Sequence, residues 1–147
     1  MQIYQRVNKY QISAVIWMGV IFCMSTGPFS SAYTSRIIEP MLHFLLPQLS
    51  DHQLHLIHGI IRKAGHVTEY FILGVLLFRA FRGNAVERWQ PRWAIYTIAV
   101  LVFYAATDEY HQSFVASRTA SVVDVGIDSI GGLLSVAAVI IRQKIEK

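Results

Sequence analysis

Three otherwise apolar segments of this chain each carry a group of acidic, basic and histidine side chains at one end. The groups fall in residues 62–70, 107–112 and 118–128. Ionisable side chains are costly inside hydrocarbon, so several of them at matching depths in successive helices are expected to meet in one site. A fold for this chain must therefore bring the same end of three separate helices together.

The composition is that of an integral membrane protein. Of 147 residues, 54% are hydrophobic and 15% are charged, and the mean hydropathy is +0.41; these values are too apolar for an ordinary soluble domain. The chain is long enough for a single domain over residues 1–147, and four spans of about 20 residues would use most of it. The single cysteine, Cys23, excludes an intrachain disulfide. The net charge of +4 comes from basic residues at the ends of apolar segments, so no nucleic-acid partner is expected.

We predict an all-α polytopic membrane helix bundle with four transmembrane helices, at about residues 9–28, 64–81, 93–112 and 121–141. The first could be mistaken for a signal peptide, because Arg6 and Lys9 precede a short apolar stretch. The residues that follow lack a convincing cleavage site, which favours a retained helix.

Residues 27–62 form one long connection with apolar residues at helical spacing. This pattern predicts two short amphipathic helices, broken near Pro40, Pro47 and residues 50–51, that lie flat on the outer surface. They either cover the polar cluster as a lid or simply cover the bundle. His55 and His58 stand at i and i+3, a spacing that could suit a metal, although interfacial histidines that only reach toward water are commoner.

Basic residues indicate the orientation, since cytoplasmic segments are enriched in Lys and Arg. Nine of the thirteen flank one side of the predicted spans: Arg6, Lys9, Arg79, Arg82, Arg88, Arg92, Arg142, Lys144 and Lys147. Both termini are therefore expected in the cytoplasm. The polar groups then face the extracytoplasmic leaflet, with His66, Asp108 and Asp128 each about 20–22 Å above the cytoplasmic ends of their helices.

On the second span, Lys63, His66 and Tyr70 share one helix face. His66 is a candidate proton donor or phosphate partner, oriented by Glu69 or Tyr70. The structural alternative is an interhelical hydrogen bond that holds the bundle together.

On the third span, adjacent Asp108 and Glu109 cannot turn to the same partner. We expect Glu109 and Gln112 to share the face that turns inward. Asp108, on an adjoining face, is expected to pair with His111 or Gln112, to cap, to reach toward water or to pair with Arg118. Arg118 could satisfy the acids, bind phosphate with its planar guanidinium, or form a salt bridge with Asp124.

On the fourth span, Ser121, Asp124 and Asp128 form one stripe that continues through Gly131 and Gly132. The glycines favour close helix packing. Ser121 could be an N-cap with Asp124 at the third helical position. Asp128 lies one turn deeper and must be partnered, protonated or functional.

At these positions the chain resembles the VanZ-like family of small bacterial membrane proteins. The resemblance covers about residues 63–132 and follows His66-x-x-Glu69-Tyr70-x-x-Leu73-Gly74, then Asp108-Glu109-x-x-Gln112-x-Phe114-x-x-x-Arg118-x-x-Ser121-x-x-Asp124-x-x-x-Asp128-x-x-Gly131. This chain departs from the family at Asp128, where Asn is common, and at residues 115–117, where the family has Pro-Gly before the arginine. The resemblance implies an inner-membrane location and, through the namesake, a link to glycopeptide antibiotic resistance. It does not define a reaction.

Two function classes follow. In the first, the protein binds an anionic lipid headgroup or a lipid-linked envelope precursor through Lys63, His66, Tyr70, Glu109, Gln112, Arg118, Ser121, Asp124 and Asp128. In the second, it is a membrane enzyme acting on such a substrate, with or without a divalent metal, through His66, Glu69, Glu109, Asp124 and Asp128. The sequence leaves the ligand, the metal content and the oligomeric state open.

Overall fold

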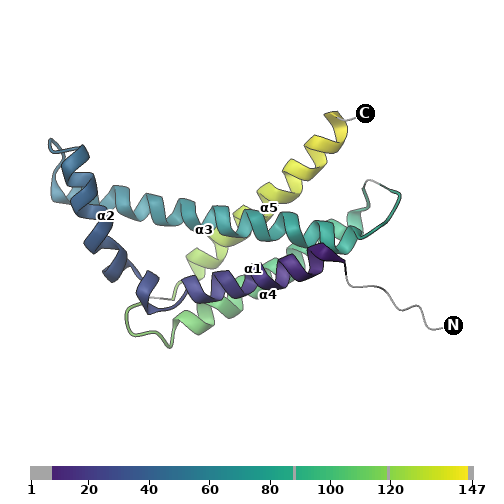
Figure 1. The fold of residues 1–147 in the computed structure, drawn as a ribbon, viewed down its shortest axis with the longest axis horizontal. Coiled ribbons are helices and arrows are strands. Elements are labelled where there is room, and N and C mark those ends of the chain that lie inside the picture. The colour runs from purple at the N-terminus through teal and green to yellow at the C-terminus, as the bar shows by residue number, and fades with distance from the viewer. Residues whose placement is uncertain (1–7, 88, 119, 146–147) are drawn as a thin grey trace.

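The computed structural model describes residues 8–87, 89–118 and 120–145, and within these residues it is helical with no strand. The elements in chain order are α1 (Lys9–Met24), the 3-10 turn η1 (Gly27–Phe29), α2 (Ser31–Leu45), α3 (Asp51–Arg82), α4 (Pro91–Gln112) and α5 (Val122–Ile145) (Figure 1). The predicted all-α class is confirmed. Three basic residues used for the orientation, Arg6, Arg88 and Lys147, lie outside the described residues.

Local sequence signals set the helix boundaries. Asn8 begins α1 and Ser50 begins α3, each through a capping box in which the cap side chain and the third helical residue satisfy each other's backbone N–H groups. Pro91 occupies the first turn of α4, where its missing N–H has no helical partner. Gly83 ends α3 with a φ of 56°, a conformation that favours glycine.

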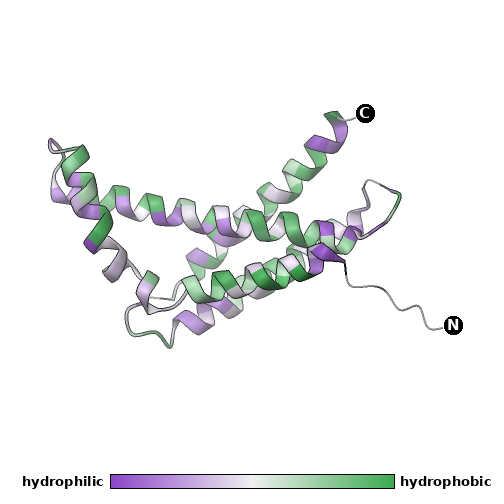
Figure 2. Ribbon diagram, viewed as in Figure 1, coloured by the Kyte–Doolittle hydropathy of each residue, from purple (hydrophilic) through white to green (hydrophobic). Residues whose placement is uncertain are grey.

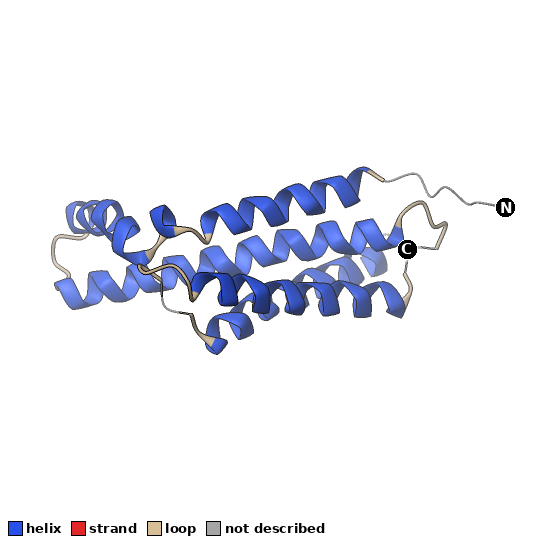
Figure 3. Ribbon diagram, turned by 90° about the horizontal axis from the view of Figure 1, so that it is seen from below, coloured by secondary structure: helices blue, strands red, loops and turns tan. Residues whose placement is uncertain are grey.

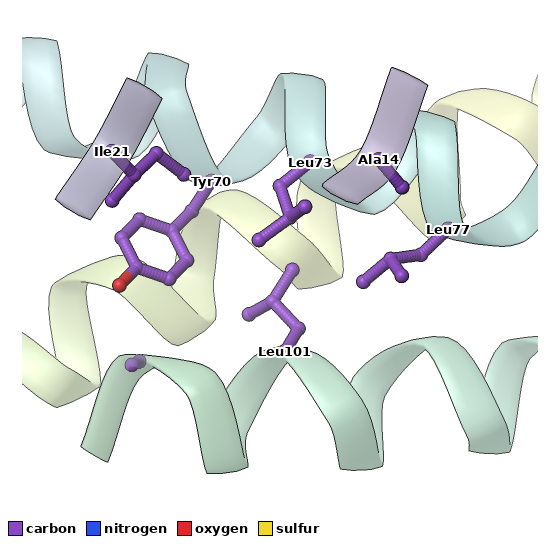
Figure 4. Close-up of a cluster of buried hydrophobic side chains, with 7 residues drawn as sticks. Ala14, Ile21, Tyr70, Leu73, Leu77 and Leu101 are labelled. Carbon is purple, nitrogen blue, oxygen red and sulfur yellow. The ribbon is translucent and has the colours of Figure 1, made fainter. Parts of the chain in front are cut away.

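The helices α1, α4 and α5 pack around the C-terminal part of α3, while its N-terminal part extends past the bundle and carries α2 (Figures 1 and 3). A hydrophobic cluster of side chains from α1, α3 and α4 forms the core between these helices (Figure 4). Its buried members are Ala14, Ile21, Tyr70, Leu73, Leu77, Leu101 and Ala105.

The long connection differs from its prediction. One amphipathic helix, α2, is present, but it continues through Pro40 without the expected break. The second predicted helix is not separate: α3 runs unbroken for 32 residues and combines residues 54–61 with the predicted span 64–81. The reason is local. The capping box at Ser50 starts the helix, and there is no proline between Ser50 and Arg82 to interrupt it.

Within the described residues, two helices are each long and apolar enough to cross a membrane, α3 and α5. A third crossing is obtained only if α1 and the Gly27–Leu45 segment count as one span, bent by 75° at the break between them. Polar residues at both ends of α4 lower its hydropathy, and Figure 2 shows the hydrophilic end of this helix that leads into the α4–α5 connection. The structure thus supports a membrane-compatible helical bundle, and four separate spans are not established by helix length and composition.

The two ends of the bundle differ in charge. The beginning of α1, the end of α3, the beginning of α4 and the end of α5 lie at one end (Figure 3). The described basic residues there are Lys9, Arg79, Arg82, Arg92, Arg142 and Lys144. The three polar groups picked out in the sequence lie toward the other end.

Candidate functional site

The contact between His66 and Asp128 joins α3 to α5 and forms the centre of the site. The His66 Nδ1 atom lies 3.2 Å from Asp128 Oδ1, with Asp128 wholly buried and His66 partly exposed. The sequence predicted matching depths for these two residues, and the contact confirms it. It also corrects the expected orienting partner of His66, which is Asp128 rather than Glu69 or Tyr70.

Glycines allow α3 and α5 to approach closely enough for this contact. A methyl group at Gly131 would collide with the backbone carbonyl oxygen of Val67, next to His66. At Gly132 it would lie 2.6 Å from Leu101 Cδ1 of α4. The predicted packing role of this glycine pair is confirmed.

Asp108 anchors α4 to the end of α1. Its Oδ2 atom accepts hydrogen bonds from Ser25 Oγ at 2.6 Å and from Gln112 Nε2 at 2.9 Å, and all three residues are buried. The predicted pairing of Asp108 with Gln112 is therefore confirmed, whereas the alternatives, that Asp108 would cap, reach toward water or pair with Arg118, are wrong. One turn of helix separates Asp108 from Gln112, so these two side chains share a face, and that face contacts α1.

Glu109 is also buried, but it faces a different partner. Its Oε2 atom accepts the backbone N–H of Ser121 at 2.8 Å, just before the first residue of α5. Ser121 Oγ in turn accepts the N–H of Val123 at 3.1 Å, which confirms its capping role. The two carboxylates face different partners, as predicted, and the burial of both Glu109 and Gln112 confirms that these two side chains face inward.

Arg118 stabilises the carboxyl end of α1 rather than pairing with Asp124. Its Nη2 atom donates to the carbonyl oxygen of Met24, one of the free acceptors at the end of α1, and to that of Thr26 in the turn that follows. The basic residue beside Asp124 is Lys63, not Arg118, with 3.9 Å between Lys63 Nζ and Asp124 Oδ1. Burial lowers the pKa of the Arg118 guanidinium from its usual value, and this effect marks a cation that is only partly solvated.

Two adjoining hollows open among these residues. The larger, of about 230 Å³, is lined by Ser31, Gly59, Arg62, Lys63, His66, Gln112, Ser117, Arg118 and Asp124. The smaller, of about 150 Å³, is lined by Met24, Ser25, Phe29, Thr34, Arg62, Gly65, His66, Glu69 and Arg118. Three residues line both: Arg62, His66 and Arg118.

The predicted ligand-binding residues divide into two sets. Those that line the hollows are Lys63, His66, Gln112, Arg118 and Asp124. Glu109, Ser121 and Asp128 do not line either hollow: Asp128 contacts His66, and Glu109 contacts Ser121 at the start of α5. Tyr70 belongs to neither set, because its ring is fully buried in the hydrophobic core (Figure 4).

The sequence reasoning missed Arg62. This residue is half-buried and touches both hollows. Its spacing contained the signal, since Arg62, His66 and Glu69 stand at i, i+4 and i+7 and so lie along one helix face. The i, i+3, i+7 stripe of Lys63, His66 and Tyr70, which the sequence also offers, ends in the core at Tyr70.

The fold and the site define a class: a small helical bundle with membrane-compatible helices and a basic hollow backed by buried carboxylates. The family model VanZ/LLP1 matches residues 11–143, nearly the whole chain. The chain belongs to the VanZ/LLP1 family, as its polar motifs indicated. No curated protein and no solved structure matches it.

Proposed function

We propose that this protein binds an anionic headgroup, carried by a membrane lipid or a lipid-linked envelope precursor, in the two hollows that α2, α3 and the α4–α5 connection line. One observation supports the proposal most directly. Arg62 Nη1 and Arg118 Nε are buried donors with no hydrogen-bond partner among the described residues, and both side chains line the two hollows. A buried donor left unpaired is costly, so these positions favour a ligand that supplies acceptor oxygens.

The charges around the hollows favour a phosphate-like anion. Arg62 and Arg118 are electrostatic neighbours of like sign, and Lys63 and His66 line the same space. An anion between the two guanidinium groups relieves their repulsion, and the planar fork of arginine matches phosphate or carboxylate oxygens. Two acids, Asp124 and Glu69, line the hollows, but the cations Arg62, Lys63 and Arg118 outnumber them. Lys63 also lies 3.9 Å from Asp124 and offsets its charge.

The membrane placement is part of the same proposal. α4 has 22 residues, which corresponds to about 33 Å of helix and is enough for a span. With α1, α3 and α5 it would make a four-span protein of the bacterial inner membrane. The basic end of the bundle supports cytoplasmic termini, and in that orientation the hollows would face the extracytoplasmic leaflet.

A lipid-binding comparison tests the proposed ligand. The full chain and an Arg62→Gln variant, each purified in neutral detergent, are titrated with phosphatidylglycerol or phosphatidylcholine and observed by native mass spectrometry. We expect phosphatidylglycerol to bind the unmodified chain more tightly than phosphatidylcholine, and R62Q to lose most of that preference.

Arg36→Gln is the matched control, because Arg36 lies on α2 near the same end and its side chain packs over the Tyr33 ring, outside the hollows. It removes the same charge from the same end of the protein. Equal losses in R62Q and R36Q would show that only the overall charge matters, and would contradict a specific site.

The link to glycopeptide resistance is tested with the same pair of variants. Expression in a susceptible host should raise the inhibitory concentration of the antibiotic for the unmodified chain and R36Q, but not for R62Q.

An enzyme is the second candidate, and the His66–Asp128 contact is the observation that favours it. A histidine held at 3.2 Å from a fully buried carboxylate, and lining both hollows, has the arrangement of an oriented acid or base. Incubation with a lipid phosphate substrate, followed by phosphorus NMR, distinguishes the two classes. Turnover that disappears in His66→Gln supports an enzyme; binding of intact lipid without product supports the binding protein.

A further inference from the structure

A second group of ionisable side chains lies away from the hollows, where α2 packs against the N-terminal part of α3. It consists of Glu39 from α2 with His55 and His58 from α3. One ligand atom from each residue lies within 4.8 Å of the other two. Two imidazoles and a carboxylate are a ligand set that Zn²⁺ uses in proteins.

The burial and the hydrogen bonding of His58 prepare one ring nitrogen as a ligand. Its side chain is 1% exposed, and its Nε2 atom lies 3.1 Å from Thr34 Oγ1. The Thr34 hydroxyl has a single proton, which it donates to the Ser30 carbonyl oxygen at 3.0 Å. At His58 the hydroxyl therefore accepts, which places the imidazole proton on Nε2 and leaves the Nδ1 lone pair free. This is the second-shell arrangement that orients a metal-ligating histidine.

Glu39 lies on the side of His58 where that lone pair points. The distance from His58 Nδ1 to Glu39 Oε1 is 3.5 Å, and from His55 Nδ1 to the same oxygen it is 2.9 Å. The His55 contact is a hydrogen bond in which Nδ1–H donates to the carboxylate, and a metal ion would replace that proton. At His58 the Nδ1 lone pair and the carboxylate oxygen repel each other unless a proton or a metal ion lies between them. The side chains of Glu39 and His55 are 35% and 69% exposed, so an ion can enter from solvent.

We propose that Glu39, His55 and His58 bind a Zn²⁺ ion that holds α2 against α3. In a tetrahedral site with Zn–N distances of about 2.0–2.1 Å, the ligand atoms are about 3.3 Å apart. The three ligand atoms now lie within 4.8 Å of one another, and the exposed His55 ring can turn to bring its nitrogen to the tetrahedral distance from the other two. Three protein ligands leave a fourth position for water, and Glu39 also lines an open hollow of about 410 Å³ that would admit it.

The zinc site would be separate from the anion hollows but mechanically connected to them. Thr34 contacts His58 and also lines the smaller hollow, while Ser31 on the same helix lines the larger one. A metal ion that holds α2 against α3 would therefore also hold in place the side of the hollows that α2 forms. Metal binding itself does not depend on the proposed anion ligand.

Zinc titration of the full chain tests the site. The protein is purified in detergent with a tag that contains no histidine, stripped with a chelator, and titrated with zinc chloride against a fluorescent zinc indicator. We expect one zinc per chain, and X-ray absorption at the zinc edge should show two imidazole ligands. Glu39→Gln and His55→Ala should each abolish this stoichiometric binding. Thr34→Val, which removes only the second-shell acceptor, should weaken it by about 10- to 100-fold.

His43→Ala is the matched control, because His43 lines the same open hollow and is not one of the three ligands. It should bind zinc as the unmodified chain does. The proposal is overturned if the unmodified chain binds no stoichiometric zinc, or if E39Q and H55A bind it as tightly as H43A does. Both variants change exposed or half-exposed side chains, and their circular dichroism should match that of the unmodified chain.

Discussion

Gly131→Ala should destabilise the bundle by separating α3 from α5. The added methyl group would meet the Val67 carbonyl oxygen, and it would lie 3.1 Å from Phe71 N and 3.2 Å from Tyr70 Cβ. The first two are backbone atoms, which cannot rotate away as a flexible side chain can. Overpacking of this kind costs about 1–3 kcal/mol, whereas alanine gains about 1 kcal/mol over glycine in a helix interior. Because the obstacle is rigid, we take the upper end of the cost and expect a net loss of about 2 kcal/mol.

Gly126→Ala provides the internal control for this prediction. Gly126 is on the same helix, but a methyl group there would meet nothing within 4 Å. It should therefore leave the stability unchanged or raise it by up to about 1 kcal/mol. Reversible unfolding in sodium dodecyl sulfate, followed by circular dichroism, measures both free energies, and the two variants should differ by about 3 kcal/mol. Equal stability of G131A and G126A would refute the close approach of α3 and α5.

Two further perturbations test the fold. Ser25→Ala removes the hydroxyl that donates to buried Asp108 at 2.6 Å; it should lower the unfolding free energy by about 1.5–3 kcal/mol, the value of a hydrogen bond to a charged group, and a loss below about 0.5 kcal/mol would contradict this anchor. The proposed topology is tested with single cysteines in a Cys23→Ser background: a membrane-impermeant maleimide added to intact cells should label Gln48→Cys, in the α2–α3 turn, and should label Ala85→Cys, between α3 and α4, only after the cells are opened. The reverse pattern would place the termini outside the cytoplasm.

The sequence alone predicted the helical class and the positions where polar groups interrupt apolar helices. It also predicted that His66 and Asp128 lie at the same depth, because the helical rise fixes the height of a residue once the helix ends are known. The capping role of Ser121 was predictable for a similar reason. Hydroxyl side chains at helix starts satisfy nearby backbone N–H groups, and that interaction is local in sequence.

The tertiary structure decided which side chains face one another. Adjacent residues on a helix differ by about 100° in direction, so the sequence separated Asp108 from Glu109 but did not give the rotation of α4. That rotation depends on how the end of α1 packs against it, and it turns Asp108 toward Ser25. The partners of Arg118 were not predictable from the sequence either, because the carbonyl oxygens of Met24 and Thr26 belong to a segment more than 90 residues earlier in the chain.

Arg62 and Glu39 show the same division between sequence and structure. Both are ordinary polar residues in the sequence, and their surroundings depend on α2 folding back against an unbroken α3. The helical period gives the height and the relative angle of each residue on its own helix. Crossing geometry between helices is determined by side-chain packing over the whole bundle, and only that geometry decided that two arginines share a hollow and that a glutamate meets two histidines.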